Sequence, residues 1–154
     1  MTAKSVRKTL HLGIIGPGLV GSEFLAQILA FQKAPAVARW SVSVVAISNS
    51  KTMSLSHSGE DIQLEHWKDI LSSADAKAEL SLLADHVSSF KNGVLVDCTA
   101  SDSVALQYAS WIVKGLSIIT PNKKAFSASM ESWNGLFDLA SEKGIGLFHE
   151  STVG

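Results

Sequence analysis

The stretch "GIIGPGLVGSEFLAQIL", residues 13–29, places Gly16, Gly18 and Gly21 at the spacing G-x-G-x-x-G. An apolar strand-like run precedes the motif and an amphipathic helical pattern follows it, which is the setting this motif requires. Gly16 would permit a tight turn, Gly18 the close approach of a pyrophosphate, and Gly21 close packing of the helix on the strand. Pro17 offers no N–H, so the other amides of the loop would bind the phosphate. The motif predicts dinucleotide binding, with a purely structural turn as the alternative.

Strand-like and helical segments alternate along the rest of the chain. Predicted strands cover residues 10–16, 40–48, 93–99, 116–120 and 145–151, and helical segments cover 19–34, 62–71, 75–90, 103–115 and 129–144, with a loop over 49–61. This alternation of apolar strands and helices is typical of a parallel sheet covered on both faces. We therefore predict an α/β fold, a doubly wound parallel sheet of five strands (Rossmann-like). Residues 1–9 are expected to form a tail and residues 10–154 one dinucleotide-binding domain.

Composition excludes several classes of protein. The chain has 154 residues, 46% of them hydrophobic, which is enough to bury the core of one domain. Its formal net charge of -1 gives no electrostatic reason to bind nucleic acid or an anionic membrane. No apolar run approaches the ~18 residues that span a bilayer, and the basic start lacks the pattern of a signal peptide. With Cys98 as its single cysteine, the chain is expected to be a soluble intracellular domain.

The end of the second predicted strand bears on the choice of cofactor. An acidic residue at this position usually binds the ribose 2′-hydroxyl of NAD. Here the chain reads "AISNSK", residues 46–51, and contains no Asp or Glu. Lys51 would attract a 2′-phosphate, although it would equally serve as a solvated loop lysine. The sequence therefore favours NADP, with NAD as the alternative.

Two further loops follow predicted strands at the edge where open α/β sheets bind ligands. In "VDCTASDS", residues 96–103, Ser101 or Asp102 would cap the next helix, and the Thr99 hydroxyl is the better candidate for a ligand contact. In "TPNKKAFS", residues 120–127, Lys123 and Lys124 place cations where the nicotinamide end of a cofactor would lie, unless they only face solvent.

Taken together, "GIIGPGLVGSEFL", "VLVDCTASDSVALQYA", "IITPNKKAFS" and the terminal "HESTVG" resemble the nucleotide-binding domain of homoserine dehydrogenase, including the form fused to aspartate kinase. The resemblance runs from about residue 10 to the last residue. It implies NADPH- or NADH-dependent reduction of aspartate semialdehyde to homoserine, in threonine and methionine biosynthesis. It also implies a homodimer located in the cytoplasm or in a plastid.

The resemblance implies roles for particular positions. The glycine loop with Leu19 and Val20 would hold the pyrophosphate and the neighbouring sugar, Thr99 and Ala100 would lie along the nicotinamide half, Lys123 would contact the cofactor near the substrate, and Glu150 with the Val153 carbonyl would form part of a sodium site. Oxygen ligands suit such a hard cation.

The family continues beyond "TVG" into a substrate and dimerisation domain that carries its proton-donor lysine. This chain ends at Gly154, so we expect a fragment without catalytic residues that is inactive alone. The alternative function is a non-catalytic module that senses cofactor or pairs with full-length subunits. Another oxidoreductase, aspartate-semialdehyde dehydrogenase, would need a catalytic cysteine in a loop, whereas Cys98 ends an apolar strand and is assigned to packing.

Overall fold

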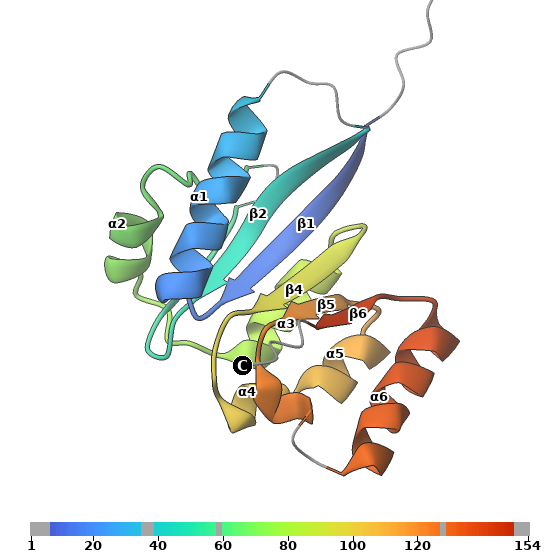
Figure 1. Ribbon diagram of the computed structural model, residues 1–154. Helices are drawn as coiled ribbons and strands as arrows, with labels where there is room; N and C mark the ends of the chain where they lie inside the picture. The colour runs from blue at the N-terminus through green and yellow to red at the C-terminus, as the bar shows by residue number, and fades with distance from the viewer. Residues whose placement is uncertain (1–6, 35–38, 58–59, 127–128, 150–154) are drawn as a thin grey trace, which may run out of the picture.

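In the computed structural model, residues 7–34, 39–57, 60–126 and 129–149 are described, and they form a six-stranded sheet with helices on both sides (Figure 1). The strands are β1 (Lys8–Ile15), β2 (Trp40–Ser48), β3 (Met53–Leu55), β4 (Gly93–Asp97), β5 (Ser117–Thr120) and β6 (Leu147–His149). The helices are α1 (Leu19–Lys33), α2 (Trp67–Ser72), α3 (Leu80–Ser88), α4 (Asp102–Ala105), α5 (Tyr108–Val113) and α6 (Met130–Lys143), with a 3₁₀ helix, η1 (Lys123–Phe126).

The strand order is β3-β2-β1-β4-β5-β6, and all pairings are parallel except that of β2 with β3. This order confirms the predicted doubly wound α/β fold of Rossmann type. The chain runs outward from β1 through β2 to β3, and then crosses to β4 on the other side of β1. The loops that follow β1 and β4 therefore diverge, and they leave a crevice at the carboxyl ends of the strands.

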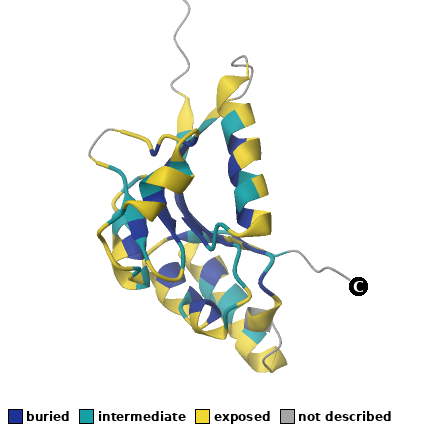
Figure 2. Cartoon of the chain, turned by 90° about the vertical axis from the view of Figure 1, so that its left-hand side faces the viewer, coloured by how far each residue is buried: buried dark blue, intermediate teal, exposed yellow. Residues whose placement is uncertain are grey.

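Apolar side chains of the sheet pack into two separate clusters because successive strand residues point to opposite faces. On one face, Leu25 and Ile28 of α1 and Leu71 of α2 pack with strand residues such as Val44 and Val96. On the other face, α3, α5 and α6 pack against the sheet, and this cluster contains Leu83, Val87, Leu95, Trp111, Ile112, Ile118 and Ala140. Figure 2 shows buried residues along the strands and on the sides of the helices that face them.

Part of the α1 face of the sheet is open. Over β5 and β6 no helix of the described chain covers this face, and Ile119 and Phe148 are 39% and 62% exposed. Together with Val20 and Phe24 they border a shallow, mainly apolar hollow of about 310 Å³. Helices therefore cover both faces of the sheet at β1, β2 and β4, as expected, but only one face at β5 and β6.

Strand β3 lies where the sequence predicted only a loop, so the five-strand prediction missed one strand. The side-chain oxygen of Asn49 accepts hydrogen bonds from the backbone N–H groups of Lys51 and Thr52, at 2.7 Å each. This turn sends the chain back along β2, where Met53 is buried. The strand is short and depends on the turn, which is why periodicity did not reveal it.

Several element boundaries also differ from the predictions. The helix expected over 103–115 divides into α4 and α5, and the segments expected from residues 62 and 75 become helical only at Trp67 and Leu80. Residues before α2 extend along the sheet instead, since the Ile62 N–H donates to the Val44 carbonyl at 2.9 Å. Strand β1 begins within the expected tail, at Lys8, and β6 is described only from residue 147 to 149.

Two predicted helix ends are confirmed. The Ser101 hydroxyl accepts from the Val104 N–H and caps α4. Gly144 ends α6 in a left-handed conformation with φ 66°, which glycine adopts without strain. Among the described helices none is both long and apolar enough to cross a membrane.

Candidate functional site

The glycine loop joins the carboxyl end of β1 to the first turn of α1. Gly16 has φ 77°, and a Cβ atom there would lie 2.5 Å from Cγ2 of Thr99. Its N–H donates to the Ser48 carbonyl at 2.9 Å, and its own carbonyl accepts from the Gly18 N–H at 2.8 Å. Position 16 therefore requires glycine for both its backbone conformation and its close neighbour.

Gly18 and Gly21 meet opposite environments. A Cβ at Gly21 would lie 2.6 Å from the Gly16 carbonyl oxygen and 3.3 Å from Cβ of Cys98, so the missing side chain lets α1 lie close to the loop and to the chain after β4. A Cβ at Gly18 would meet no atom within 4 Å. Gly18 thus leaves a space beside the backbone that no atom of the described chain occupies.

The first turn of α1 presents free backbone donors. Gly18 is the N-cap and offers no side chain to the helix end, and the Ser22 N–H is the first in the helix to bond, to the Gly18 carbonyl at 2.8 Å. Among the described residues no acceptor faces the N–H groups of Leu19, Val20 and Gly21. The side chains of Leu19 and Val20 are 94% and 59% exposed. This helix end has the donors and the partial positive charge that attract a phosphate.

A cleft of about 780 Å³ begins at this loop and spans the crevice between β1 and β4. Its lining comes from the glycine loop, the turn after β2, α2 and the loop after β4: Ile15, Gly16, Pro17, Gly18, Asn49, Ser50, Trp67, Lys68, Leu71, Ser72, Ala78, Leu80, Cys98, Thr99, Ser101, Ser103 and Val104. None of these residues is an Asp or a Glu. An anionic ligand would therefore meet no like charge from the lining itself.

Lys68 is the cation that borders the cleft near the end of β2. It extends from α2, with Nζ 5.6 Å from the ring centre of Trp67. Lys51, the lysine predicted from the sequence to attract a 2′-phosphate, is exposed and does not belong to the lining. Lys68 was missed because its nearness to the turn after β2 depends on how α2 packs, which the local sequence does not reveal.

The loop after β4 brings Thr99 to the cleft, whereas Ala100 beside it is exposed. The Thr99 N–H donates to Asp97 at 2.8 Å, and its hydroxyl oxygen accepts from the Ser101 N–H at 3.2 Å. The Thr99 hydroxyl hydrogen has no such partner among the described residues and can be donated to a ligand.

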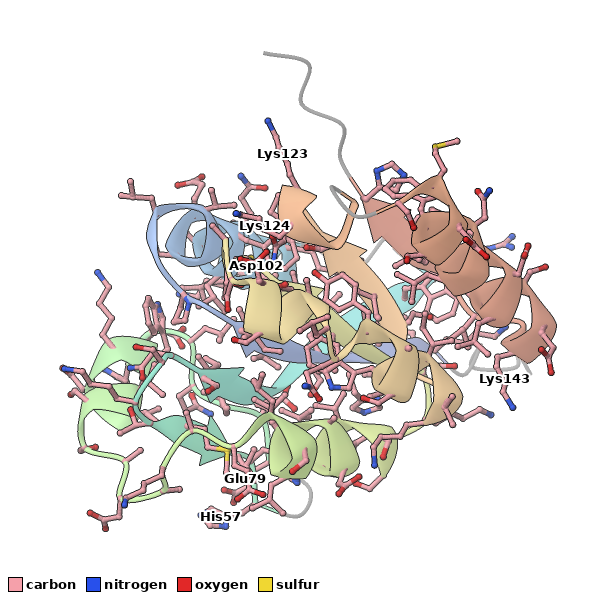
Figure 3. All side chains as sticks on the ribbon, turned by 90° about the horizontal axis from the view of Figure 1, so that it is seen from below. His57, Glu79, Asp102, Lys123, Lys124 and Lys143 are labelled. Atoms are coloured by element: carbon pink, nitrogen blue, oxygen red, sulfur yellow. The ribbon has the colours of Figure 1, made fainter. Side chains whose placement is uncertain are left out.

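The two lysines after β5 differ in their surroundings. Lys123 opens η1 and is exposed, and its side chain points away from the body of the protein in Figure 3. It does not line the cleft. Lys124 lies 3.7 Å from Asp102 at the start of α4, so the loops after β4 and β5 are linked by an ion pair.

A buried polar cluster beneath these two loops was not recognised in the sequence. Asp97, Thr120 and Asn122 are at most 2% exposed, and the fully buried Tyr108 brings its hydroxyl to within 2.6 Å of Asp97 Oδ2 and 2.8 Å of Thr120 Oγ1. Burial, and then the hydrogen bond to Asp97, raise the pKa of Tyr108 far above its usual value. The tyrosine therefore remains a neutral O–H donor.

Neither Cys98 nor a metal cluster adds a reactive group to the described part of the site. Burial, and secondarily the charge of Asp97, raise the pKa of the Cys98 thiol to about 11, so it is protonated at neutral pH and is a poor nucleophile. Within the described ranges no three His, Cys, Asp or Glu side chains gather as a metal site. The predicted sodium ligands Glu150 and Val153 lie outside the described residues.

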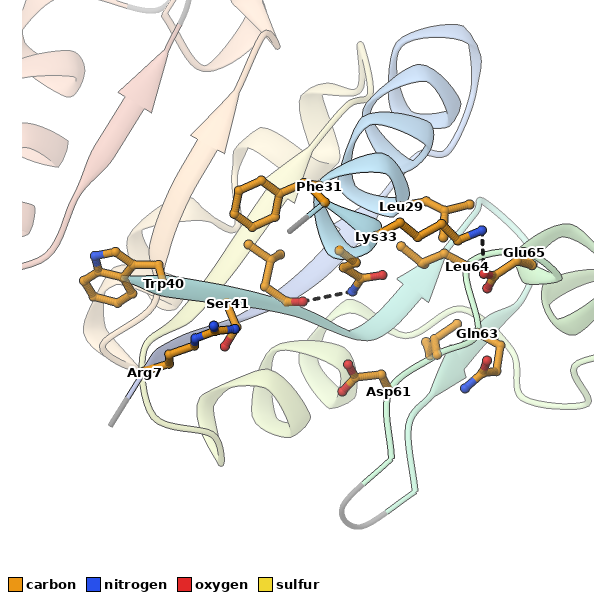
Figure 4. Close-up of a pocket in the computed structure, with 14 residues that line it drawn as sticks. Arg7, Leu29, Phe31, Lys33, Trp40, Ser41, Asp61, Gln63, Leu64 and Glu65 are labelled. Atoms are coloured by element: carbon orange, nitrogen blue, oxygen red, sulfur yellow. Dashed lines mark hydrogen bonds and ion pairs between the residues drawn. The ribbon is translucent and has the colours of Figure 1, made fainter. Parts of the chain in front are cut away.

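A second hollow, of about 430 Å³, lies at the other end of the sheet, between the end of α1, the start of β2 and residues 61–65 (Figure 4). Its rim carries charges of both signs, including the ion pair between Lys33 and Glu65 at 3.0 Å. It lies at the amino ends of β1 and β2, whereas open parallel sheets bind ligands at the carboxyl ends. The cleft beside the glycine loop is therefore the candidate site.

Comparison with known proteins shows the family to which the chain belongs. Residues 16–150 match the family model described as homoserine dehydrogenase, NAD binding domain. The chain is 39% identical over 155 residues to bifunctional aspartokinase/homoserine dehydrogenase 2, chloroplastic, of Zea mays, covering 96% of this chain and 16% of that protein. It is 36% identical over 150 residues to homoserine dehydrogenase of Schizosaccharomyces pombe, covering 96% of this chain and 40% of that protein.

The fold is also found in a solved structure of a hyperthermophilic archaeal homoserine dehydrogenase in complex with NADPH. The two share 24% identity and a TM-score of 0.71, covering 94% of this chain and 44% of the archaeal one. In each of these comparisons the chain spans less than half of the matched protein.

Proposed function

Because the chain belongs to the homoserine dehydrogenase family, whose NAD-binding domain it matches over residues 16–150, we propose that it binds NADPH in the cleft between the glycine loop and the loop after β4. The observation that carries this proposal is the free space beside Gly18, next to a helix end with three unpaired backbone N–H groups. A pyrophosphate placed there accepts these hydrogen bonds and meets the positive end of the α1 dipole. The NADPH complex of the archaeal homoserine dehydrogenase supports this choice of ligand.

NADPH is preferred over NADH in this proposal. Among the described residues that line the cleft there is no carboxylate to accept from a ribose 2′-hydroxyl and repel a 2′-phosphate. Lys68 supplies a cation at the cleft, and Lys51 lies in the nearby turn after β2. A phosphate at the ribose 2′ position is attracted by both lysines, and Lys68 is the nearer candidate.

The nicotinamide half then lies along Thr99 and Ala100, with Lys123 beyond it. Bound NADPH supplies the hydride that, in the intact family, reduces aspartate semialdehyde to homoserine. The role of this chain is to bind and orient the nicotinamide ring, and the Thr99 hydroxyl donates a hydrogen bond to it. Lys123 contacts the cofactor only if its side chain turns from the solvent-facing position seen in Figure 3.

We propose further that the chain alone does not turn over substrate. Among the described residues, the titratable groups that line the cleft are Lys68, which is assigned to the phosphate, and Cys98, whose thiol stays protonated at neutral pH. General acid–base assistance contributes roughly 10²–10⁴-fold to such reactions, and orientation of the substrate contributes more. The chain alone therefore binds the cofactor without catalysis. This agrees with the second candidate function, a non-catalytic module that senses cofactor or pairs with full-length subunits.

Calorimetric titration with NADPH and NADH tests binding, and NADPH formation from homoserine and NADP tests turnover. A folded sample that binds neither cofactor contradicts the proposed function. Turnover that disappears in the Lys123→Ala variant would show that this chain holds a complete catalytic site.

Three further expectations from the family remain proposals. A sodium ion held by Glu150 and Val153 is tested by comparing the melting temperature in sodium chloride and in choline chloride. A homodimer is tested by analytical ultracentrifugation. Location in the cytoplasm or a plastid is tested by imaging of a fluorescent fusion, and the chloroplastic name of the maize relative supports the plastid.

A further inference from the structure

The carboxylate of Asp97 is enclosed at the end of β4 and accepts hydrogen bonds on both oxygens. Asp97 is 0% exposed. Its Oδ1 accepts from the Thr99 N–H at 2.8 Å, and its Oδ2 accepts from the Tyr108 hydroxyl at 2.6 Å and from the Asn122 amide at 3.0 Å. These three donors are uncharged, and they come from the loop after β4, from α5 and from the loop after β5.

Asn122 extends this network across the two loops. One amide hydrogen of its side chain goes to Asp97, and the other goes to the Ser101 carbonyl at 3.0 Å. Its side-chain oxygen accepts from the Lys124 N–H at 3.0 Å, and its own N–H donates to Thr120 Oγ1 at 2.8 Å. The bonds to Asp97 and Ser101 fix where the loop after β5 lies relative to the loop after β4, and the bonds with Thr120 and Lys124 hold Asn122 within its own loop.

Asp97 and Asn122 do not line the cleft, but the residues that they hold do. Thr99 and Ser101 both belong to the lining, and they are bonded to the network through a backbone N–H and a backbone carbonyl. We propose that Asp97 is a positioning residue that, through Thr99 and Asn122, sets how the loops after β4 and β5 hold the nicotinamide half of the cofactor. This inference rests on the proposed function.

The network requires a carboxylate rather than an amide at position 97. An asparagine there would turn its NH₂ either toward the Thr99 N–H or toward the Asn122 amide, and either arrangement sets two donors against each other in a buried place. Tyr108 cannot relieve this at the Thr99 side, because its hydroxyl lies on Oδ2. Asp97→Asn therefore keeps the size of the side chain but removes the hydrogen bond to position 97 from either the Thr99 N–H or the Asn122 amide.

The test compares NADPH with 2′-phospho-ADP-ribose, which lacks the nicotinamide ring. The ratio of the two dissociation constants, fragment over NADPH, reports what the nicotinamide half contributes. We expect Asp97→Asn and Asn122→Ser each to lower this ratio by about tenfold, while the dissociation constant of the fragment changes by less than about twofold because the glycine loop is intact. A matched control, Ile112→Ala, removes buried apolar packing on α5 outside the network, and it should leave the ratio unchanged.

The inference is overturned if the ratio is unchanged in the folded variants, or if Ile112→Ala lowers it equally. If either Asp97→Asn or Asn122→Ser fails to fold, the other variant is the test. If both fail to fold, the network supports the fold rather than the positions of the loops, and the inference is overturned. A wild-type ratio near one also overturns the inference, but it leaves NADPH binding standing. A wild-type chain that binds neither molecule contradicts the proposed function instead.

Discussion

Replacing Gly18 with alanine separates the fold of the glycine loop from its binding role. The backbone at Gly18 has φ -77° and ψ -144°, with negative φ and no left-handed strain, and the new methyl group meets no atom within 4 Å. Alanine is a poorer N-cap than glycine, by less than about 1 kcal/mol, and the loss is partly offset because alanine restricts the unfolded chain by about 0.4–1 kcal/mol. The free energy of unfolding should therefore change by less than about 1 kcal/mol.

Binding should respond far more than stability. The methyl group occupies the free space beside the loop, so a pyrophosphate must move away from the N–H groups of α1. Losing one hydrogen bond to a charged group costs about 1.5–3 kcal/mol, which corresponds to a roughly ten- to hundredfold rise in the dissociation constant. Calorimetric titration with NADPH measures this rise, and urea unfolding monitored by circular dichroism measures the stability.

Gly135→Ala is the matched control. Gly135 lies in α6, is exposed, and has free space around its Cβ position in the same way. Alanine should stabilise this helix by about 0.5–1 kcal/mol and leave NADPH binding as it is. Equal NADPH affinity in the wild type, Gly18→Ala and Gly135→Ala would refute the phosphate-binding role of the loop.

Three other predictions concern the loop, the lysines and pH. Gly16→Ala should lower the free energy of unfolding by about 1–3 kcal/mol, because φ is 77° and the new methyl group would meet Thr99; an unchanged urea midpoint would contradict this. Lys68→Glu should raise the dissociation constant for NADPH relative to NADH more than Lys51→Glu does, and an unaltered ratio in both variants would show that neither lysine meets the 2′-phosphate. Burial lowers the pKa of His86 below 6.5, so the unfolded chain binds the proton more readily and stability should fall as pH drops below 6.5. Urea unfolding at about pH 7.5 and about pH 5.5 measures this loss, and His86→Gln should show a smaller loss than the wild type.

The long elements of the fold could be predicted because their patterns are local. Strand β1 ends in a buried apolar run and β2 is rich in β-branched residues. Helix α1 follows a glycine motif that has a strand before it and a helical pattern after it. Strand β3 escaped because three residues carry little periodicity, and because the Asn49 turn that pairs them with β2 is a side-chain feature. The architecture could therefore be predicted from the sequence, but this edge of the sheet could not.

The candidate site was predictable in part for the same reason. Glycines that follow a strand indicate a phosphate loop through local spacing alone, whereas Lys68 lies at the cleft only because Ile62 and Leu64 anchor the preceding segment against the sheet. Asp97 and Asn122 are 25 positions apart, and in the sequence Asp97 resembles an ordinary strand-end residue and Asn122 an ordinary loop residue. Only their shared burial reveals that they act together.

One edge of the sheet and its uncovered face affect how the molecule behaves in concentrated solution. Strand β3, the outermost strand on one side of the sheet order, is three residues long. An edge that short offers few unpaired amide and carbonyl groups to a strand of another molecule, which limits sheet-to-sheet polymerisation at this edge. The surface that favours self-association is instead the uncovered face of β5 and β6, where the apolar side chains of Ile119 and Phe148 are exposed to solvent. Self-association of the isolated chain should therefore proceed by stacking of faces, and a salt that strengthens apolar contacts should promote it.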